Sequence, residues 1–135
     1  EFIVVDSSDA RAAVARAMVS GKAYSMCSFV LGAQAFVVVV SDKGTWMTKI
    51  GNVVRDTKLY LIDIGIACEH FILRATDLGI GTCWIGWFHE RKVKKLLGIP
   101  RSKRVDVVIA MGYPPADYQV PQKNRKELKD IVAYR

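Results

Sequence analysis

The chain has 135 residues, a net charge of +7, a hydrophobic content of 51% and a mean hydropathy of +0.17. This length allows one domain with a real core and excludes a large multidomain enzyme within these residues. The longest apolar run, residues 35–40, is too short to span a bilayer, and no signal-peptide pattern opens the chain. The apolar content therefore predicts an oligomer rather than a membrane protein.

The first third of the chain predicts a strand, a helix and a second strand. Residues 2–5 form a buried strand, and Ser7 or Ser8 can cap a helix that runs to about Val19 and stops at Gly21. Residues 22–31 are ambiguous, and residues 35–40 predict a strand buried on both faces. Because the chain opens with Glu inside a strand pattern, we expect it to be part of a longer protein.

Residues 43–58 are the least patterned stretch, and the strongest helical pattern follows, from residue 59 or 61 to residue 78. The unpatterned stretch carries Trp46 and Met47 among polar residues. The helix has two apolar stripes: Ile64, Ala67, Cys68, Phe71, Ala75 and Leu78 form one, and Ile62, Ile66 and Leu73 form the other. An α-helix with apolar residues on two sides is buried on two sides, so this pattern predicts contact with both the sheet and a second layer or subunit.

Residues 77–89 combine three glycines in eight residues with an apolar Cys83-Trp84-Ile85 centre. Gly79 is predicted to be the left-handed residue that ends the preceding helix, and residues 83–85 a short buried strand or an extended loop. A dinucleotide fingerprint requires a strand before the glycines and a helix after them. Here the glycines follow a helix, so that interpretation is excluded, and Gly81 and Gly86 are left as places of close backbone approach.

The last third predicts a short helix at residues 90–97, ended by Gly98 and Pro100, and a buried strand at residues 105–111. The tail to residue 135 is polar except for a short pattern of Leu128, Ile131 and Val132. No repeat or linker interrupts the chain, so residues 1–135 are predicted to form one domain.

Chemistry carried by protein side chains finds no support in this sequence. The three cysteines fit neither a disulfide framework nor a zinc site and indicate a reducing cytoplasm, and Cys68 and Cys83 lie in apolar patterns typical of core residues. His70 and His89 have no nucleophile or carboxylate at motif spacing, which favours structural roles. We predict no catalytic side chain and no metal site, and therefore a cofactor that supplies the chemistry.

The excess positive charge is local. Residues 91–104 contain seven of the 20 basic residues and no acidic residue, so they account for the whole net charge of +7. A nucleic-acid surface is one interpretation. A solvated helix face is favoured, because Val93, Leu96 and Leu97 form an apolar stripe and no aromatic residue is present to stack on bases. We therefore expect no nucleic-acid partner.

Four motifs in order resemble the nitroreductase family of flavin enzymes. They are Gly-Ile-Ala-Cys at 65–68, Leu-Gly-Ile-Gly-Thr-Cys-Trp-Ile-Gly at 78–86, Leu-Leu-Gly-Ile-Pro at 96–100 and Met-Gly-Tyr-Pro at 111–114. The resemblance implies an α+β fold, with a mixed β-sheet flanked by helices in three αβα layers. It also implies a homodimer with the long helix at its interface, FMN as cofactor and an N-terminal segment, absent from this sequence, that carries arginines for the flavin phosphate.

The resemblance also assigns the cofactor residues. Cys83, Trp84, Ile85 and Gly86 correspond to the turn beside the flavin ring, where the backbone amide of Gly86 would donate to N5; the family often has an acidic residue at that position. Lys123 and Arg125 correspond to a Lys-x-Arg pair that binds the phosphate.

The implied activity is ping-pong transfer of hydride from NAD(P)H, through the flavin, to a small electron acceptor such as a nitroaromatic or a quinone. Positive charge near the flavin N1–O2 edge would stabilise the reduced anion, and the family supplies it largely from the N-terminal segment. Two alternatives stay open at this point. The first is another flavin chemistry, reductive dehalogenation or flavin fragmentation, and the second is a non-enzymatic protein that binds nucleic acid through residues 91–104.

Overall fold

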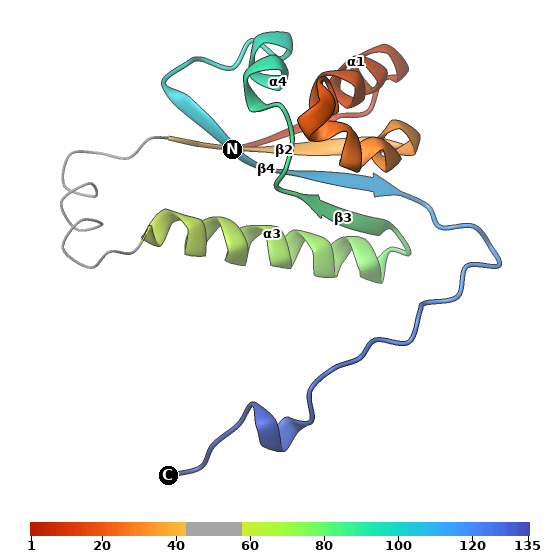
Figure 1. Cartoon of the computed structure of the whole chain (residues 1–135), viewed down its shortest axis with the longest axis vertical. Coiled ribbons are helices and arrows are strands. Elements are labelled where there is room, and N and C mark those ends of the chain that lie inside the picture. The colour runs from red at the N-terminus through yellow and green to blue at the C-terminus, as the bar shows by residue number, and fades with distance from the viewer. Residues whose placement is uncertain (43–57) are drawn as a thin grey trace.

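The computed structural model describes residues 1–42 and 58–135, and Figure 1 shows their arrangement. The elements in chain order are β1 (Phe2–Val5), α1 (Ser8–Met18), the 3-10 helix η1 (Lys22–Gly32), β2 (Ala35–Asp42), α3 (Leu59–Asp77), β3 (Gly81–Ile85), α4 (Glu90–Leu96), β4 (Lys103–Gly112) and the 3-10 turn η2 (Leu128–Asp130). Trp46 and Met47 lie outside the described residues.

The described strands form one four-stranded sheet in the order β1-β2-β4-β3, and all three pairings are antiparallel. The α+β class is confirmed, but the mixed sheet is not what these strands form. The mixed sheet was implied by the family resemblance, and it would include a parallel pair, whose connection needs a helix that carries the chain back along the sheet. Between β1 and β2 the chain instead passes through two helical segments, α1 and η1, and re-enters the sheet at the end where β1 finished.

The predicted three layers are confirmed. The helices α1, η1 and α4 cover one face of the sheet, and α3 covers the other (Figure 1). The first face packs Phe36, Val38 and Val108 against Val14 and Met18 of α1. The second face packs a smaller cluster against Cys68 of α3. Strand alternation explains the division, because successive side chains of β2 and β4 point to opposite faces.

Helix positions agree closely with the sequence pattern. Gly79 has a φ of 74°, so the left-handed residue expected after α3 is present, and Gly98, with a φ of 65°, does the same after α4. The ambiguous residues 22–31 form η1. Strand β1 is less buried than predicted: Phe2 is 44% and Val4 62% exposed, because β1 lies at the sheet edge and neither helical layer covers it fully.

Beyond β4 the chain leaves the sheet as an extended tail (Figure 1). Residues 113–135 are exposed at every position, and the hydrogen bonds that residues 115–135 make with described residues join only members of that tail. Among the described residues, no helix has the length and apolar character needed to cross a membrane.

Candidate functional site

A pocket of about 360 Å³ lies where the end of β3 meets α3 and β4. Its lining residues are Leu61, Ile64, Gly65, Trp84, Gly86, Asp106 and Val107. The volume lies in the range of small-molecule sites, which are mostly apolar with a few fixed polar groups. One charged side chain, that of Asp106, stands among these otherwise apolar or glycine positions.

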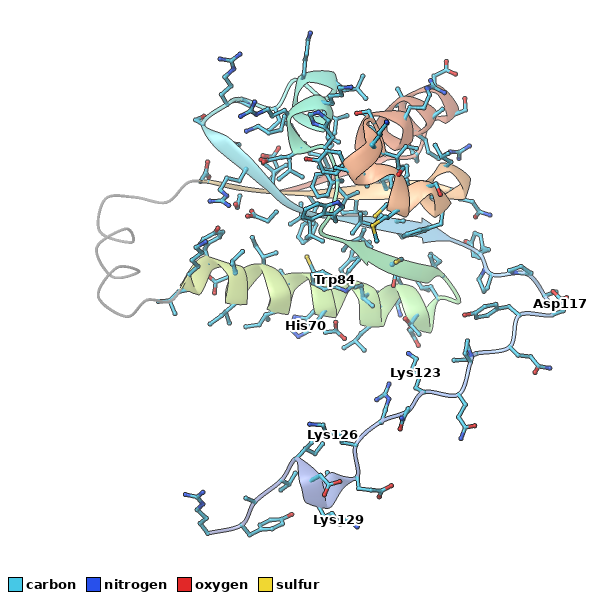
Figure 2. All side chains as sticks on the ribbon, viewed as in Figure 1. His70, Trp84, Asp117, Lys123, Lys126 and Lys129 are labelled. Carbon is cyan, nitrogen blue, oxygen red and sulfur yellow. The ribbon has the colours of Figure 1, made fainter. Side chains whose placement is uncertain are left out.

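The sequence places Trp84 and Gly86 in this pocket through the alternation of β3. Ile85 points to the opposite face, where it is 2% exposed and belongs to the core beneath α1 and α4. Trp84 therefore points toward α3 (Figure 2). It is 43% exposed, which leaves much of its indole ring available to a ligand.

Two glycines leave backbone open in the pocket. A Cβ atom added to Gly65 of α3 or to Gly86 after β3 would meet no other heavy atom of the described residues within 4 Å. Packing among those residues therefore does not explain either glycine. Gly81 is different, because its Cβ would lie 3.2 Å from the carbonyl oxygen of Gly112. At Gly81, the close backbone approach predicted from the sequence is the approach of the neighbouring strand β4. At Gly86, the space beside the backbone is open.

Sequence analysis missed Asp106. The register of β2 and β4 shifts, with Val39 opposite Val107 and Val40 opposite Val105, so Asp106 is the extra residue of a β-bulge. Bulges re-aim side chains and are frequent next to active sites. The Asp106 side chain is only 6% exposed, accepts a hydrogen bond from the Ser41 hydroxyl and lies 3.4 Å from Nε of Arg104. An acidic residue inside a valine-rich strand was the available signal.

The segment that follows Gly86 is held by η1. Nε1 of Trp87 donates to the carbonyl of Ala23 at 2.7 Å, and Sγ of Cys27 lies 3.3 Å from the carbonyl oxygen of Trp87, within hydrogen-bonding distance. The ring of Tyr24 lies 5.9 Å from that of Trp87 and 5.2 Å from that of His89. These contacts fix the turn after β3 from the side opposite α3.

The six residues that the sequence assigned to a cofactor are not brought together within the single chain. Cys83, Trp84, Ile85 and Gly86 are contiguous at β3, whereas Lys123 and Arg125 lie on the extended tail (Figure 2). Neither basic side chain makes a hydrogen bond or ion pair with the described parts of the chain. Ile85 is buried, so only its backbone is accessible to a ligand.

The cysteines differ in their surroundings. Cys68 is fully buried, and burial raises the pKa of its thiol, so it stays protonated as a core residue. Cys83 is exposed, and the core position predicted for it is wrong, because β3 is an edge strand and the helical layer does not cover its Cys83 position. Within residues 1–42 and 58–135, no group of three or more metal-ligating side chains is present.

Comparison with known proteins gives a consistent result. Residues 1–113 match the profile of the nitroreductase family. A curated protein of Archaeoglobus fulgidus named "Putative NADH dehydrogenase/NAD(P)H nitroreductase" is 32% identical over 97 residues, which are 69% of this chain and 52% of that protein. The chain therefore spans about half the length of this relative.

Solved structures show the same similarity. A nitroreductase family protein from Clostridium novyi NT is 35% identical, with a TM-score of 0.65 over 84% of this chain and 61% of that one. The FMN-dependent nitroreductase from Clostridium difficile R20291 is 23% identical, with a TM-score of 0.63 over 96% of this chain and 69% of that one, and it shows the likeness of fold.

Proposed function

Because the chain belongs to the nitroreductase family, we propose that it is the larger part of an FMN-dependent oxidoreductase that transfers electrons from NAD(P)H to a small acceptor. A nitroaromatic or a quinone is the proposed class of acceptor. The observation that supports this most is the pocket at the end of β3, where Trp84 and the open backbone of Gly86 meet α3. One structural neighbour is an FMN-dependent nitroreductase, which is consistent with the choice of cofactor.

The pocket residues fit the ring of a flavin. A flat aromatic ring needs a shallow apolar slot, and Ile64, Val107 and the indole of Trp84 supply one. The missing side chain of Gly86 allows the ring edge to approach the backbone, where an amide N–H can donate to N5. The chemistry that FMN would supply in this pocket is the transfer of hydride from NAD(P)H to the acceptor in a ping-pong cycle.

The protein's own groups then position and enclose the ring. The contacts of Trp87 with Ala23 and Cys27 hold the turn that contains Gly86, so the amide does not have to reorganise when a ligand binds. Asp106 places an acceptor oxygen at the same pocket, with Ser41 and Arg104 compensating its charge. These residues orient a ligand, and no protein side chain is proposed as a nucleophile or general base.

We propose that the protein works as a homodimer with the flavin at the interface, as a single domain in the cytoplasm. One side of α3 packs on the sheet, and its other side exposes Ile62, Ile66 and Leu73 by 53%, 54% and 59%. An apolar helix face of this kind favours cover by a partner. The tail also exposes apolar residues, and a dimer would give it a surface on which Lys123 and Arg125 can approach a flavin phosphate. The three free thiols agree with a reducing compartment.

Replacing Lys123 and Arg125 together with alanine should lower FMN affinity by about 100-fold or more. Each contributes charge-assisted hydrogen bonds worth about 1.5–3 kcal/mol, and neither has a competing partner among the described residues. Quenching of FMN fluorescence during titration measures the affinity. The matched control is Lys126→Ala with Lys129→Ala, two exposed lysines on the same tail (Figure 2), which should bind as wild type. Unchanged affinity in the first variant would remove the phosphate assignment.

The proposed reaction is tested by its two halves. Under nitrogen, NADH or NADPH should bleach the visible absorption of the FMN-loaded protein, and a nitroaromatic or quinone added afterwards should restore it. Steady-state rates measured at several acceptor concentrations should give parallel double-reciprocal lines, as expected when donor and acceptor use one site in turn. Bleaching that no acceptor reverses would contradict the proposed acceptor class, and intersecting lines would contradict the shared site.

A further inference from the structure

A second, larger hollow lies between α4 and the start of β4, and it shares no lining residue with the β3 pocket, although its Arg104 pairs with Asp106 of that pocket. Its volume is about 1080 Å³. Its lining residues are Glu90, Arg91, Lys94, Lys95, Gly98, Ile99, Pro100, Arg101, Lys103 and Arg104, and we call it the basic groove. Helix α4 belongs to the layer opposite α3 (Figure 1). The basic segment seen in the sequence is therefore folded around a concave surface and does not form a single solvated helix face.

Internal contacts fix the shape of the groove. The Lys94 side chain is 14% exposed, and its Nζ donates to the carbonyl of Lys103, with the carbonyl of Arg101 at 3.5 Å and a carboxylate oxygen of Glu90 at 3.9 Å. The same Glu90 oxygen accepts the backbone N–H of Val105 at 3.1 Å. Lys94 and Glu90 thus connect α4 to the turn before β4. The Glu90 carboxylate, the acidic group in the lining of the groove, is engaged in these contacts.

Two other cations of the groove also have partners. Nζ of Lys103 lies 2.8 Å from the Glu1 carboxylate, and this hydrogen bond raises the pKa of Lys103 and lowers that of Glu1, so the pair remains charged at neutral pH. Arg104 pairs with Asp106 and lies over the ring of Tyr60, 5.7 Å from its centre. Lys103 and Arg104 therefore line the groove with charges that are already paired within the protein.

The three remaining cations have no such partner. The side chains of Arg91, Lys95 and Arg101 make no hydrogen bond and no ion pair with the part of the chain that the structure describes. Arg91 and Lys95 are four residues apart, on one side of α4, and Arg101 comes from the turn between α4 and β4. Like charges gathered around a concave surface repel one another, and a bound anion relieves that repulsion.

The size and composition of the groove indicate which anion. A volume of about 1080 Å³ is at the upper end of the range for small-molecule sites and much larger than a single inorganic anion requires. Arginine binds phosphate oxygens with two parallel hydrogen bonds, and lysine adds a mobile point charge. The ten lining residues include no aromatic side chain, so the groove lacks the stacking platform of single-strand nucleic-acid sites.

We propose that the basic groove is a binding site for a small oligophosphate, a soluble compound with two or three linked phosphates, held by Arg91 and Lys95 of α4 and by Arg101 of the turn that follows α4. The site is separate from the β3 pocket and does not depend on a bound flavin.

Isothermal titration with inorganic tripolyphosphate at low ionic strength tests the proposal. We expect one site per chain, and a loss of more than about 100-fold in affinity when Arg91, Lys95 and Arg101 are all changed to glutamine. The control variant, Lys22→Gln with Lys126→Gln and Lys129→Gln, removes the same charge from exposed positions outside the groove and should bind as wild type. Single variants such as Arg101→Gln, checked by thermal melting, should give smaller losses in a folded protein.

Three results would overturn the proposal. One is the absence of tripolyphosphate binding at low salt, and another is equal weakening in both triple variants, which would show that net charge alone attracts the anion. The third is salt-sensitive binding of a DNA duplex by a protein that does not bind tripolyphosphate, because that would identify an extended polyanion as the partner.

Discussion

Replacing Gly86 with proline should weaken FMN binding by about tenfold or more. Proline has no backbone N–H, so the variant loses the donor proposed for flavin N5. A hydrogen-bonding partner left unsatisfied in a site shielded from water costs about 1–3 kcal/mol, and each 1.4 kcal/mol is a factor of ten in affinity. FMN titration followed by fluorescence measures the change directly.

The matched control at this position is Gly86→Ala. Alanine keeps the N–H but places a Cβ in the space proposed for the ring edge. That Cβ would meet no heavy atom of the described residues within 4 Å, so the alanine variant should fold and should lose less FMN affinity than the proline variant. The proline variant should fold, because the preceding residue, Ile85, is already in an extended strand, as residues before proline prefer. Circular dichroism checks this. A folded proline variant with wild-type FMN affinity would show that the Gly86 amide does not bind the flavin.

Replacing Ile66 with lysine should convert the proposed dimer to a monomer. Ile66 is 54% exposed on the side of α3 that faces away from the sheet. Full burial of such a side chain is worth about 1.5–3 kcal/mol, and covering the exposed half of Ile66 is worth about half of that. A two-fold interface contains Ile66 twice, so the dimer weakens by about 1.5–3 kcal/mol, or roughly 10- to 100-fold. FMN retention should fall as dimerisation is lost, because the proposed flavin site lies at the interface. Analytical ultracentrifugation at micromolar concentration reads the association state.

Leu96→Lys provides the comparison for this experiment. Leu96 is 46% exposed on α4, in the layer on the other side of the sheet, so the same apolar-to-lysine change there should leave the dimer intact. A wild-type protein that sediments as a monomer, or an Ile66→Lys variant that stays dimeric, would show that α3 does not form the interface.

The sequence pattern was sufficient to predict the positions of the long buried elements α3 and β2. Helix α3 and strand β2 lie within two residues of their predicted ends, because each pattern repeats long enough to identify the buried face. The second stripe of α3, predicted to be covered by a second layer or a subunit, is exposed in the single chain, so its burial by a partner stays a prediction. The end of α3 at Gly79 followed from backbone preference alone.

Features that depend on pairing between distant segments were not predictable in the same way. The bulge at Asp106 exists only because β4 shifts register against β2, and one residue in a strand pattern does not reveal its partner. The exposure of Cys83 follows from the edge position of β3 in the sheet order. The basic groove required Lys94 to hold the turn at Arg101, a contact that an apolar stripe on α4 does not indicate. Leu96, placed in that stripe, is 46% exposed.

The central claim, that this chain carries a flavin site, is tested most directly by a visible absorption spectrum. The purified protein should be mixed with FMN, dialysed, and measured before and after anaerobic addition of NADH or NADPH. We expect the two-band spectrum of bound oxidised flavin to survive dialysis and to bleach with the reduced nucleotide. A protein that is colourless after dialysis, both as residues 1–135 and in a version extended upstream, would contradict the flavin site and the function proposed from it.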